Sequence, residues 1–401
     1  MFSLPKRSVL NKRLTPLYLA AFFEGFVLWY AIEKLFMRSI GFDDATIGLM
    51  AAVYATVMLI TETPSGILAD RWSRKGVLII ACACLAASSL ICGLSNDVPT
   101  YIMGAILWGV FYALYSGIYD SVVYDVLLEE NGNSDSYEKY YGRIKLINSL
   151  ALVLGALAGG LMGELLGLRE AFYWSIPFAI LAILALVKFK EPQLHKMAVA
   201  APLKEHVRAT FKAVAQKGYL LPILIVMVIV VVLTESLFEF SQLWLIALAA
   251  PAIIYGPAFA LILSSIGIAG FMAGYLQLDK LKIMIPTLLI TIASVVGLIL
   301  LEAVPAIITA QVILGIGLGL VSIIFTKLLH DSLPSQVRSG ASSAVSTISR
   351  LVFIPSSLAF GFISKQEGVF TAAWIWLALL VVMAIFIIKT LTYKKKLAVV
   401  T

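Results

Sequence analysis

Four ionisable side chains lie inside stretches of sequence that are otherwise apolar. They are Glu24, Asp120, Glu235 and Arg350, in residues 16–37, 100–124, 219–245 and 340–363. An ionisable group in the core of a membrane helix costs about 2.5–3.5 kcal/mol, so it normally faces protein or a water-filled cavity. Carboxyl groups at such depth suit reversible proton uptake. We therefore take these four residues as candidates for proton coupling or substrate binding.

The depth of each residue refines this interpretation. At about 1.5 Å per helical residue, Glu24 and Arg350 lie near the middle of their stretches. Arg350 is either a structural counter-ion for one of the acids or a partner of the substrate or proton. Glu33 and Glu239 fall near the outer interface, where we expect them to be solvated.

Aromatic residues are dense in the same stretches, and those of residues 100–124 follow helical spacing. Such rings either pack helices together or line a cavity, where ring faces bind apolar or cationic ligands. Trp29, Tyr112 and Gln242 complete our substrate-binding candidates.

The elements that carry these residues are membrane-spanning helices. Hydrophobic residues make up 61% of the 401 and charged residues 13%, a composition of the membrane class. A span needs roughly 20 mostly apolar residues. We expect an all-α membrane protein with spans near 16–37, 46–66, 77–95, 100–124, 143–163, 170–187, 219–245, 252–274, 284–301, 304–327, 340–363 and 369–389. The third, sixth, ninth and twelfth spans have no ionisable residue inside and can face lipid.

The net charge of +7 reflects topology rather than nucleic-acid binding. Most Lys and Arg residues fall in the amino-terminal arm and in alternate loops, all on one side of the predicted membrane. This positive-inside bias predicts a multi-pass protein of the cell inner (plasma) membrane with both termini in the cytoplasm.

Segment 188–218 divides the chain into two sets of six spans, residues 1–187 and 219–401. Within the segment, Leu203, Val207 and Phe211 share one helical face, which predicts an amphipathic helix on the inner membrane surface. The sets also show a weak repeat, since Asp70-Arg71 after span two corresponds to Asp279-Lys280 after span eight. Six-span repeats are typical of transporters.

The loop between spans two and three has a distinctive pattern. It reads Gly66-Ile-Leu-Ala-Asp70-Arg71-Trp-Ser-Arg74-Lys75-Gly76 and follows Glu62-Thr-Pro. This loop resembles the signature loop of the major facilitator superfamily, and with the half repeats the resemblance covers nearly the whole chain. It implies two six-helix bundles that rock in alternating access. It also implies a cytoplasmic latch, made by Glu62, Gly66, Asp70, Arg71, Arg74, Lys75, Asp125 and Arg143, in which Asp70 faces the start of span eleven.

These features favour a proton-coupled exporter of small amphipathic or cationic compounds, acting as a monomer in the lipid bilayer. The glycine-rich fifth span resembles an antiporter motif but lacks its proline, so a proton-linked nutrient importer stays open. A non-transporting membrane sensor or enzyme is the alternative from another class. Because no P-loop, His-Glu-x-x-His motif or paired Cys/His spacing is present, we expect no enzyme activity, no cofactor and no metal site.

Overall fold

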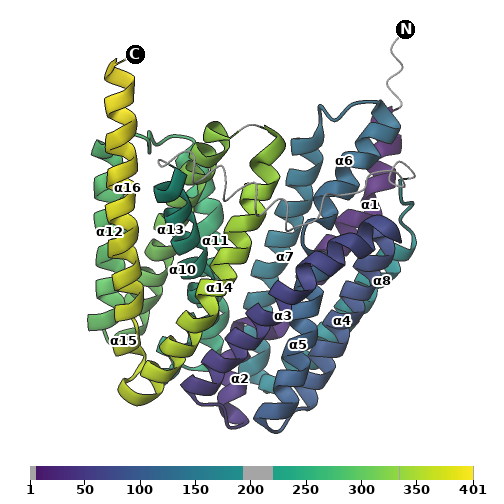
Figure 1. The fold of residues 1–401 in the computed structure, drawn as a ribbon. Coiled ribbons are helices and arrows are strands. Elements are labelled where there is room, and N and C mark those ends of the chain that lie inside the picture. Colours follow the sequence, from purple (N-terminus) through teal and green to yellow (C-terminus); the bar gives the residue numbers. More distant parts are fainter. Residues whose placement is uncertain (1–5, 193–219, 334, 401) are drawn as a thin grey trace. The chain divides into compact units, whose positions relative to one another are not determined.

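The protein is built from membrane-length helices. A computed structural model describes residues 6–192, 220–333 and 335–400 (Figure 1). Within these ranges twelve segments are long and apolar enough to span a membrane, and no strand is present. The prediction of an all-α protein with twelve spans is confirmed. The amphipathic helix expected within 188–218 lies almost entirely outside the described residues.

The helices follow one another with short connections. In chain order they are α1 (Lys6–Gly25), the 3₁₀ helix η1 (Leu28–Ile32), α2 (Glu33–Ser39), α3 (Asp44–Arg71), α4 (Arg74–Leu94), α5 (Val98–Tyr115), α6 (Ile118–Asn131), α7 (Tyr137–Leu165), α8 (Leu168–Val187), α10 (Leu220–Ala247), α11 (Ala252–Ala273), α12 (Leu281–Leu300), α13 (Val304–Ser332), α14 (Ser335–Glu367), α15 (Val369–Ala372) and α16 (Trp374–Val400).

The described helices group into two compact units. Unit 1 contains α1 to α8 except residues 43–52 at the start of α3, and it also includes Pro251–Ala260 at the start of α11. Unit 2 contains the remainder of α10 to α16 together with residues 43–52. Helices α3 and α11 therefore each contribute residues to both units.

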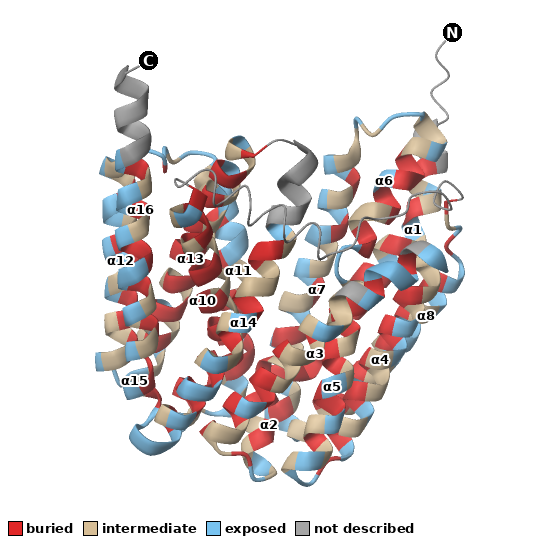
Figure 2. Cartoon of the chain, in the orientation of Figure 1, coloured by how far each residue is buried: buried red, intermediate tan, exposed pale blue. Residues whose placement is uncertain are grey.

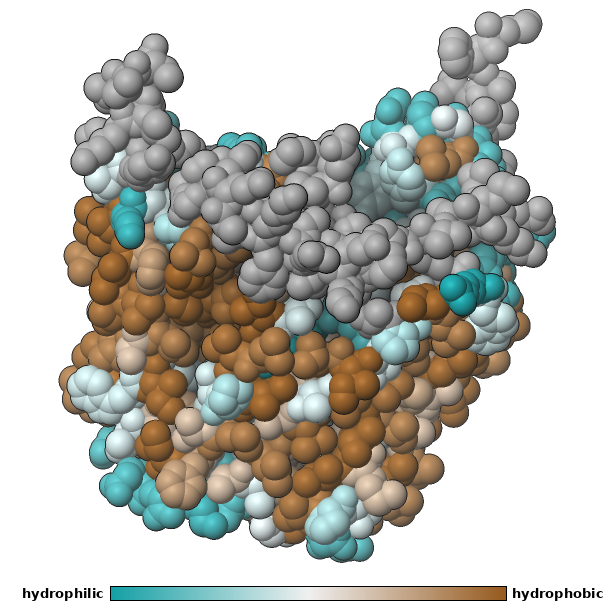
Figure 3. Space-filling model, viewed as in Figure 1, coloured by the Kyte–Doolittle hydropathy of each residue, from teal (hydrophilic) through white to brown (hydrophobic). Residues whose placement is uncertain are grey.

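Large apolar side chains remain exposed along the helices, as a lipid-facing surface requires. Examples are Leu161 on α7, Leu289 on α12 and Ile385 on α16, which are 46%, 61% and 59% exposed. Figure 2 shows exposed positions alternating with buried ones along these helices. On the face drawn in Figure 3, hydrophobic residues cover the middle of the helices, and hydrophilic residues gather toward the ends.

The first span is interrupted near its middle, between α1 and η1. Gly159 of α7 permits the interruption, because a Cβ atom there would stand 1.6 Å from the Leu28 carbonyl oxygen. The freed backbone groups find partners on neighbouring helices. The Asn148 side chain donates to the Ala21 carbonyl at 3.0 Å, and the Leu28 amide donates to Ser175 Oγ at 3.0 Å. Part of the glycine-rich fifth span thus accommodates the irregular first span.

Each unit contains a buried tryptophan that joins three spans. In unit 1 the Trp29 indole donates to Ser89 Oγ of span three at 3.0 Å and stacks on Phe172 of span six. In unit 2 the Trp244 indole donates to the Leu298 carbonyl of span nine at 2.8 Å and contacts the Trp376 ring of span twelve. The spans joined in unit 2 are each six spans later in the chain than those joined in unit 1. These contacts therefore support an internal repeat.

The start of α3 is held against α14 in unit 2. Asp43 caps α3 by accepting from the Thr46 amide at 2.8 Å, and it pairs with Lys365 at 2.7 Å. One turn along, Gly48 lies so close to α14 that a Cβ atom there would stand 2.5 Å from the Ser357 carbonyl oxygen. The Lys365 ammonium, aided by Thr46, lowers the pKa of Asp43 from 3.8 to about 2.

We predict that Asp43→Asn slightly destabilises the protein, with an effect that depends on pH in one direction. Asparagine keeps the helix cap but loses the charge, and an exposed pair contributes no more than about 1 kcal/mol. Because the folded-state pKa is depressed, the contribution is complete above about pH 4 and is lost as the pH falls toward 2. The thermal unfolding temperature should therefore differ from wild type equally at pH 8 and pH 5, and converge below pH 4. A difference that grows on acidification would contradict this assignment.

Candidate functional site

Glu24 is buried in the last turn of α1, immediately before the interruption in span one. The residue is 3% exposed. The Cys82 thiol of α4 donates to its Oε2 atom at 3.8 Å, and Oε1 has no hydrogen-bond partner among the described residues. Tyr119 and Lys145 are electrostatic neighbours of this carboxyl group. Ionising this carboxyl group in hydrocarbon is costly, so binding of a proton or a cation that neutralises it is favourable.

A ladder of aromatic rings runs along the helices of unit 1 toward Glu24. Its members are Trp29, Trp108, Tyr112, Tyr115 and Tyr119, with successive ring centroids 4.9, 5.1, 6.3 and 5.4 Å apart. Trp29 is 1% exposed and packs between helices, whereas Tyr112 is only half-buried. Trp29 therefore packs helices together, as one interpretation of the aromatic pattern predicts, and a ligand-binding role for Tyr112 stays a prediction.

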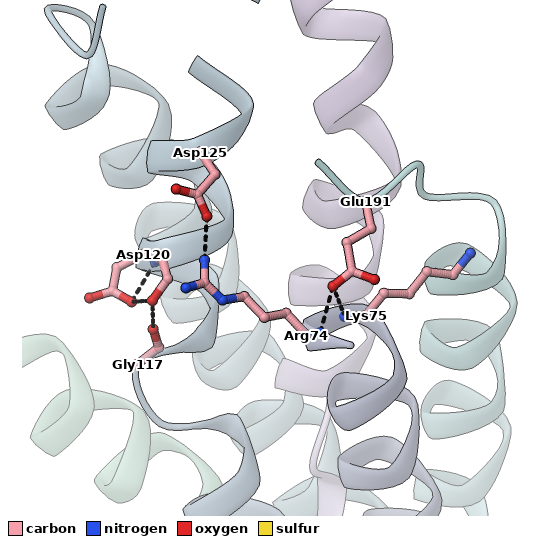
Figure 4. A network of polar contacts seen from close by, with 7 residues as sticks. Arg74, Lys75, Gly117, Asp120, Asp125 and Glu191 are labelled. Atoms are coloured by element: carbon pink, nitrogen blue, oxygen red, sulfur yellow. Dashed lines mark hydrogen bonds and ion pairs between the residues drawn. The ribbon is translucent and has the colours of Figure 1, made fainter. Parts of the chain in front are cut away.

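The fourth span is also interrupted, at Gly117 between α5 and α6. Gly117 has a φ of +75°, a left-handed conformation that glycine adopts at little cost. After the interruption, α6 begins at Ile118 and has Asp120 in its first turn. Asp120 Oδ1 accepts from the Ser121 amide at 2.6 Å, and Ser121 Oγ donates to the Gly117 carbonyl at 2.8 Å (Figure 4).

In unit 2 the structure brings together two of the candidates from separate helices. Arg350 of α14 pairs with Glu235 of α10 at 3.9 Å, and their side chains are 10% and 33% exposed. Gln242, two turns beyond Glu235 on α10, is 2% exposed. Arg350 therefore has a counter-ion within its own unit. This pairing agrees with the interpretation of Arg350 as a structural counter-ion for one of the acids.

The expectation that Glu33 and Glu239 are solvated is wrong. They are 4% and 8% exposed. Glu33 pairs with the ammonium of its neighbour Lys34 at 2.6 Å and accepts from the Tyr101 hydroxyl at 2.9 Å. The physical reason is that the Tyr101 hydroxyl of α5 and the ammonium of the adjacent Lys34 give the Glu33 carboxylate partners away from water.

The signature-type loop is tied to unit 1 at its basic end. Arg74 pairs with Asp125 of α6 (Figure 4). Lys75 donates to the carbonyls of Val187 and Phe189, at 2.7 and 2.9 Å, where α8 ends. These contacts give Arg74, Lys75 and Asp125 definite partners in the latch region.

The other residues predicted for the latch lie on α3 and α7. Arg71 is exposed, and Gly66 has open space beside it. The Glu62 carbonyl accepts from Ser65 Oγ at 2.7 Å, and Arg143 lies over the Tyr140 ring, 5.7 Å from its centroid. The Asp70 side chain and those at 335–341 of α14 lie outside the described residues, so the predicted contact of Asp70 with span eleven stays a prediction.

Sequence reasoning missed Glu191, which completes the network of the loop. Its carboxylate accepts from Ser73 Oγ at 2.6 Å and from the Arg74 and Lys75 amides at 2.5 and 3.2 Å, so it caps the start of α4 (Figure 4). Glu191 thus caps the start of α4, and Lys75 of α4 caps the end of α8, a favourable placement for both charges. A signal was available, because Glu191 is an acid among the basic residues Lys188, Lys190 and Lys196 directly after span six.

Comparison with known proteins places these features in context. Residues 14–357 match the family model described as Major Facilitator Superfamily. The class H tetracycline resistance protein of Pasteurella multocida is 27% identical over 163 residues, which cover 41% of this chain and 39% of that protein. Multidrug resistance protein 2 of Bacillus subtilis is 28% identical over 161 residues, covering 40% and 38%. The matched stretches span about two fifths of these relatives.

Solved structures share the fold along nearly the full length. A variant of the nucleoside transporter NupG aligns with a TM-score of 0.75 and 13% identity, covering 96% of this chain and 99% of that one. A D-xylose-proton symporter aligns with a TM-score of 0.68 and 15% identity, covering 94% and 97%. At such identities the likeness concerns the fold alone.

We predict that Glu191→Ala destabilises the protein by about 1.5–3 kcal/mol, the usual effect of losing hydrogen bonds to a charged group. Thermal unfolding in detergent measures this effect. Glu138→Ala is a matched control, since Glu138 is exposed near the same ends of the helices. Equal stability of the two variants would contradict the role of Glu191 as a helix cap.

The buried Glu33–Lys34 pair gives a second prediction. Glu33→Gln removes one partner of a buried pair and should cost about 3–5 kcal/mol. The double variant Glu33→Gln/Lys34→Met should recover most of this loss, because an uncharged pair has no desolvation penalty. Thermal unfolding of the two variants tests this, and a double variant no more stable than Glu33→Gln would contradict it.

Proposed function

This chain belongs to the Major Facilitator Superfamily of transporters, and on that premise we propose that it exports small amphipathic or cationic compounds in exchange for protons. The observation that carries the proposal is Glu24. A carboxyl group 3% exposed in a membrane span, with one oxygen that has no partner among the described residues, is a suitable place to bind and release a proton.

The surroundings of Glu24 support cationic or aromatic cargo. Tyr112 and Tyr115 are half-buried rings of the ladder that leads to the carboxyl. Ring faces attract organic cations, and a carboxylate adds charge complementarity. One carboxyl that accepts either a proton or a cationic solute provides competition between the two, which is the basis of exchange. Glu235, Gln242 and Arg350 supply a second polar group in unit 2 that is suited to hydrogen bonding with the solute.

The relatives support export, and the structural neighbours supply the alternative. The two curated relatives described above are resistance proteins by name, which favours efflux. One structural neighbour is a D-xylose-proton symporter, which favours proton-linked import of a nutrient as the second candidate. Transport assays in vesicles of known orientation separate the two directions.

We also propose a location and an orientation for the protein in the cell. The protein resides in the cell inner (plasma) membrane as a monomer with both termini in the cytoplasm, and it acts as a transporter rather than an enzyme. The distribution of basic residues supports this orientation. Transport proceeds by rocking of two six-helix bundles, residues 1–187 and 219–401, about a linker at 188–218. The loop at residues 66–76 latches them on the cytoplasmic side.

We predict that Glu24→Gln abolishes proton-driven transport while the protein still inserts and folds. Glutamine has the size of the carboxyl group but no titratable proton. The measurement is accumulation of a fluorescent organic cation in everted membrane vesicles, with and without an imposed pH gradient. Glu164→Gln, on the exposed end of α7, is the control. Gradient-driven accumulation by Glu24→Gln at the wild-type rate would remove Glu24 from the mechanism.

A further inference from the structure

Asp120 lies on α6 one turn from Tyr124, which belongs to a second group of tyrosines distinct from the ladder at Glu24. The group consists of Tyr124 on α6 and of Tyr137 and Tyr141 on α7, all within unit 1. Asp120 is an electrostatic neighbour of both Tyr137 and Tyr141. We call Asp120 with these three tyrosines the α6–α7 cluster.

The three rings of the α6–α7 cluster contact one another in two arrangements, one stacked and one edge-on. The Tyr137 and Tyr141 rings stack with centroids 5.4 Å apart and planes 14° apart. Tyr124 meets Tyr137 edge-on, with centroids 6.0 Å apart and planes 71° apart. Tyr124 is 44% exposed and the other two are partly exposed, so the rings have surface that no part of the described chain covers.

Charged residues of both signs lie around the cluster. Asp120 makes hydrogen bonds only to Ser121, and it forms no ion pair among the described residues. Glu138, an electrostatic neighbour of Tyr137, adds a second negative charge nearby. On the other side, the Lys145 ammonium lies 5.4 Å from the centroid of the Tyr141 ring. One ring of the cluster therefore already has a cation over its face, held by the protein itself.

From this arrangement we propose that the α6–α7 cluster is a capture site for organic cations, separate from Glu24. A carboxylate supplies the charge and tyrosine faces supply the cation–π contacts that quaternary ammonium and phosphonium ions favour. The proposal rests on the transport of cationic compounds proposed above and adds a second binding position. A solute taken up there competes with Lys145 for the ring of Tyr141.

A purely structural role for Asp120 makes a different prediction. An acid in the first turn of a helix stabilises its amino terminus, and Asp120 also accepts from Ser121. The hydrogen bonds depend on the Oδ1 acceptor, which asparagine retains, whereas the charge–dipole interaction is lost with the charge. Asp120→Asn therefore removes the charge that a cation needs and leaves the hydrogen bonds in place.

The test is binding of tetraphenylphosphonium to the full-length protein in lipid nanodiscs, measured by calorimetry against empty nanodiscs. Asp120→Asn should weaken binding about tenfold, and Tyr137→Leu should weaken it severalfold. Lys145→Gln should strengthen binding, because it removes the competing cation. The neutral analogue triphenylphosphine oxide should not distinguish Asp120→Asn from wild type. Asp135→Asn, an exposed acid in the loop between α6 and α7, is the matched control.

Repeating the series in a Glu24→Gln background separates the two carboxyl groups. We expect Glu24→Gln to retain binding that is still sensitive to Asp120→Asn and Lys145→Gln. Loss of all binding in Glu24→Gln, or equal affinities for Asp120→Asn and Asp135→Asn, would overturn the capture site. The proton-exchange proposal has its own readout in the vesicle assay, where Glu24→Gln alone decides it.

Discussion

A hydrocarbon layer offers no water to pair with polar atoms, and this constraint governs where a helix can be interrupted and where a charge can stand. Span one is interrupted directly after Glu24, and its freed backbone groups form hydrogen bonds with the side chains of Asn148 and Ser175. The close approach of Leu28 to α7 requires the glycine at 159. The irregular segment is therefore supported on several sides, and it ends α1 beside the carboxyl group on which the proposed chemistry depends.

The same constraint divides the buried charges into two kinds. Glu33 is paired with Lys34, and Arg350 with Glu235, so the charge of each has a counter-ion. Glu24 differs because it forms no ion pair among the described residues, and its Oε1 atom has no hydrogen-bond partner there. A buried carboxyl group in this condition is stabilised by binding a proton or a cation. The distinction explains why we assign exchange to unit 1 and supporting contacts to Arg350.

Features set by local composition were predictable from the sequence, and features set by distant partners were not. The twelve spans follow from length and hydropathy, and the burial of Glu24 follows from its depth in an apolar stretch. The interruption of span one depends on Gly159, more than a hundred residues away. Glu33 was assigned to water because its partner Tyr101 comes from another helix. The position of Glu191 among basic residues indicates a charge contact, but its partners are mostly backbone amides, so the sequence does not reveal the helix cap.

The paired tryptophans bear on the history of the chain. Trp29 and Trp244 brace equivalent spans in the two units, although the ionisable residues around them are unlike: one unit has an isolated carboxyl, the other an acid–arginine pair. This combination is expected of an ancestral six-span gene that duplicated and then diverged. The bracing serves the packing that each copy needs in lipid, whereas the ionisable positions carry no such common requirement and differ between the two copies.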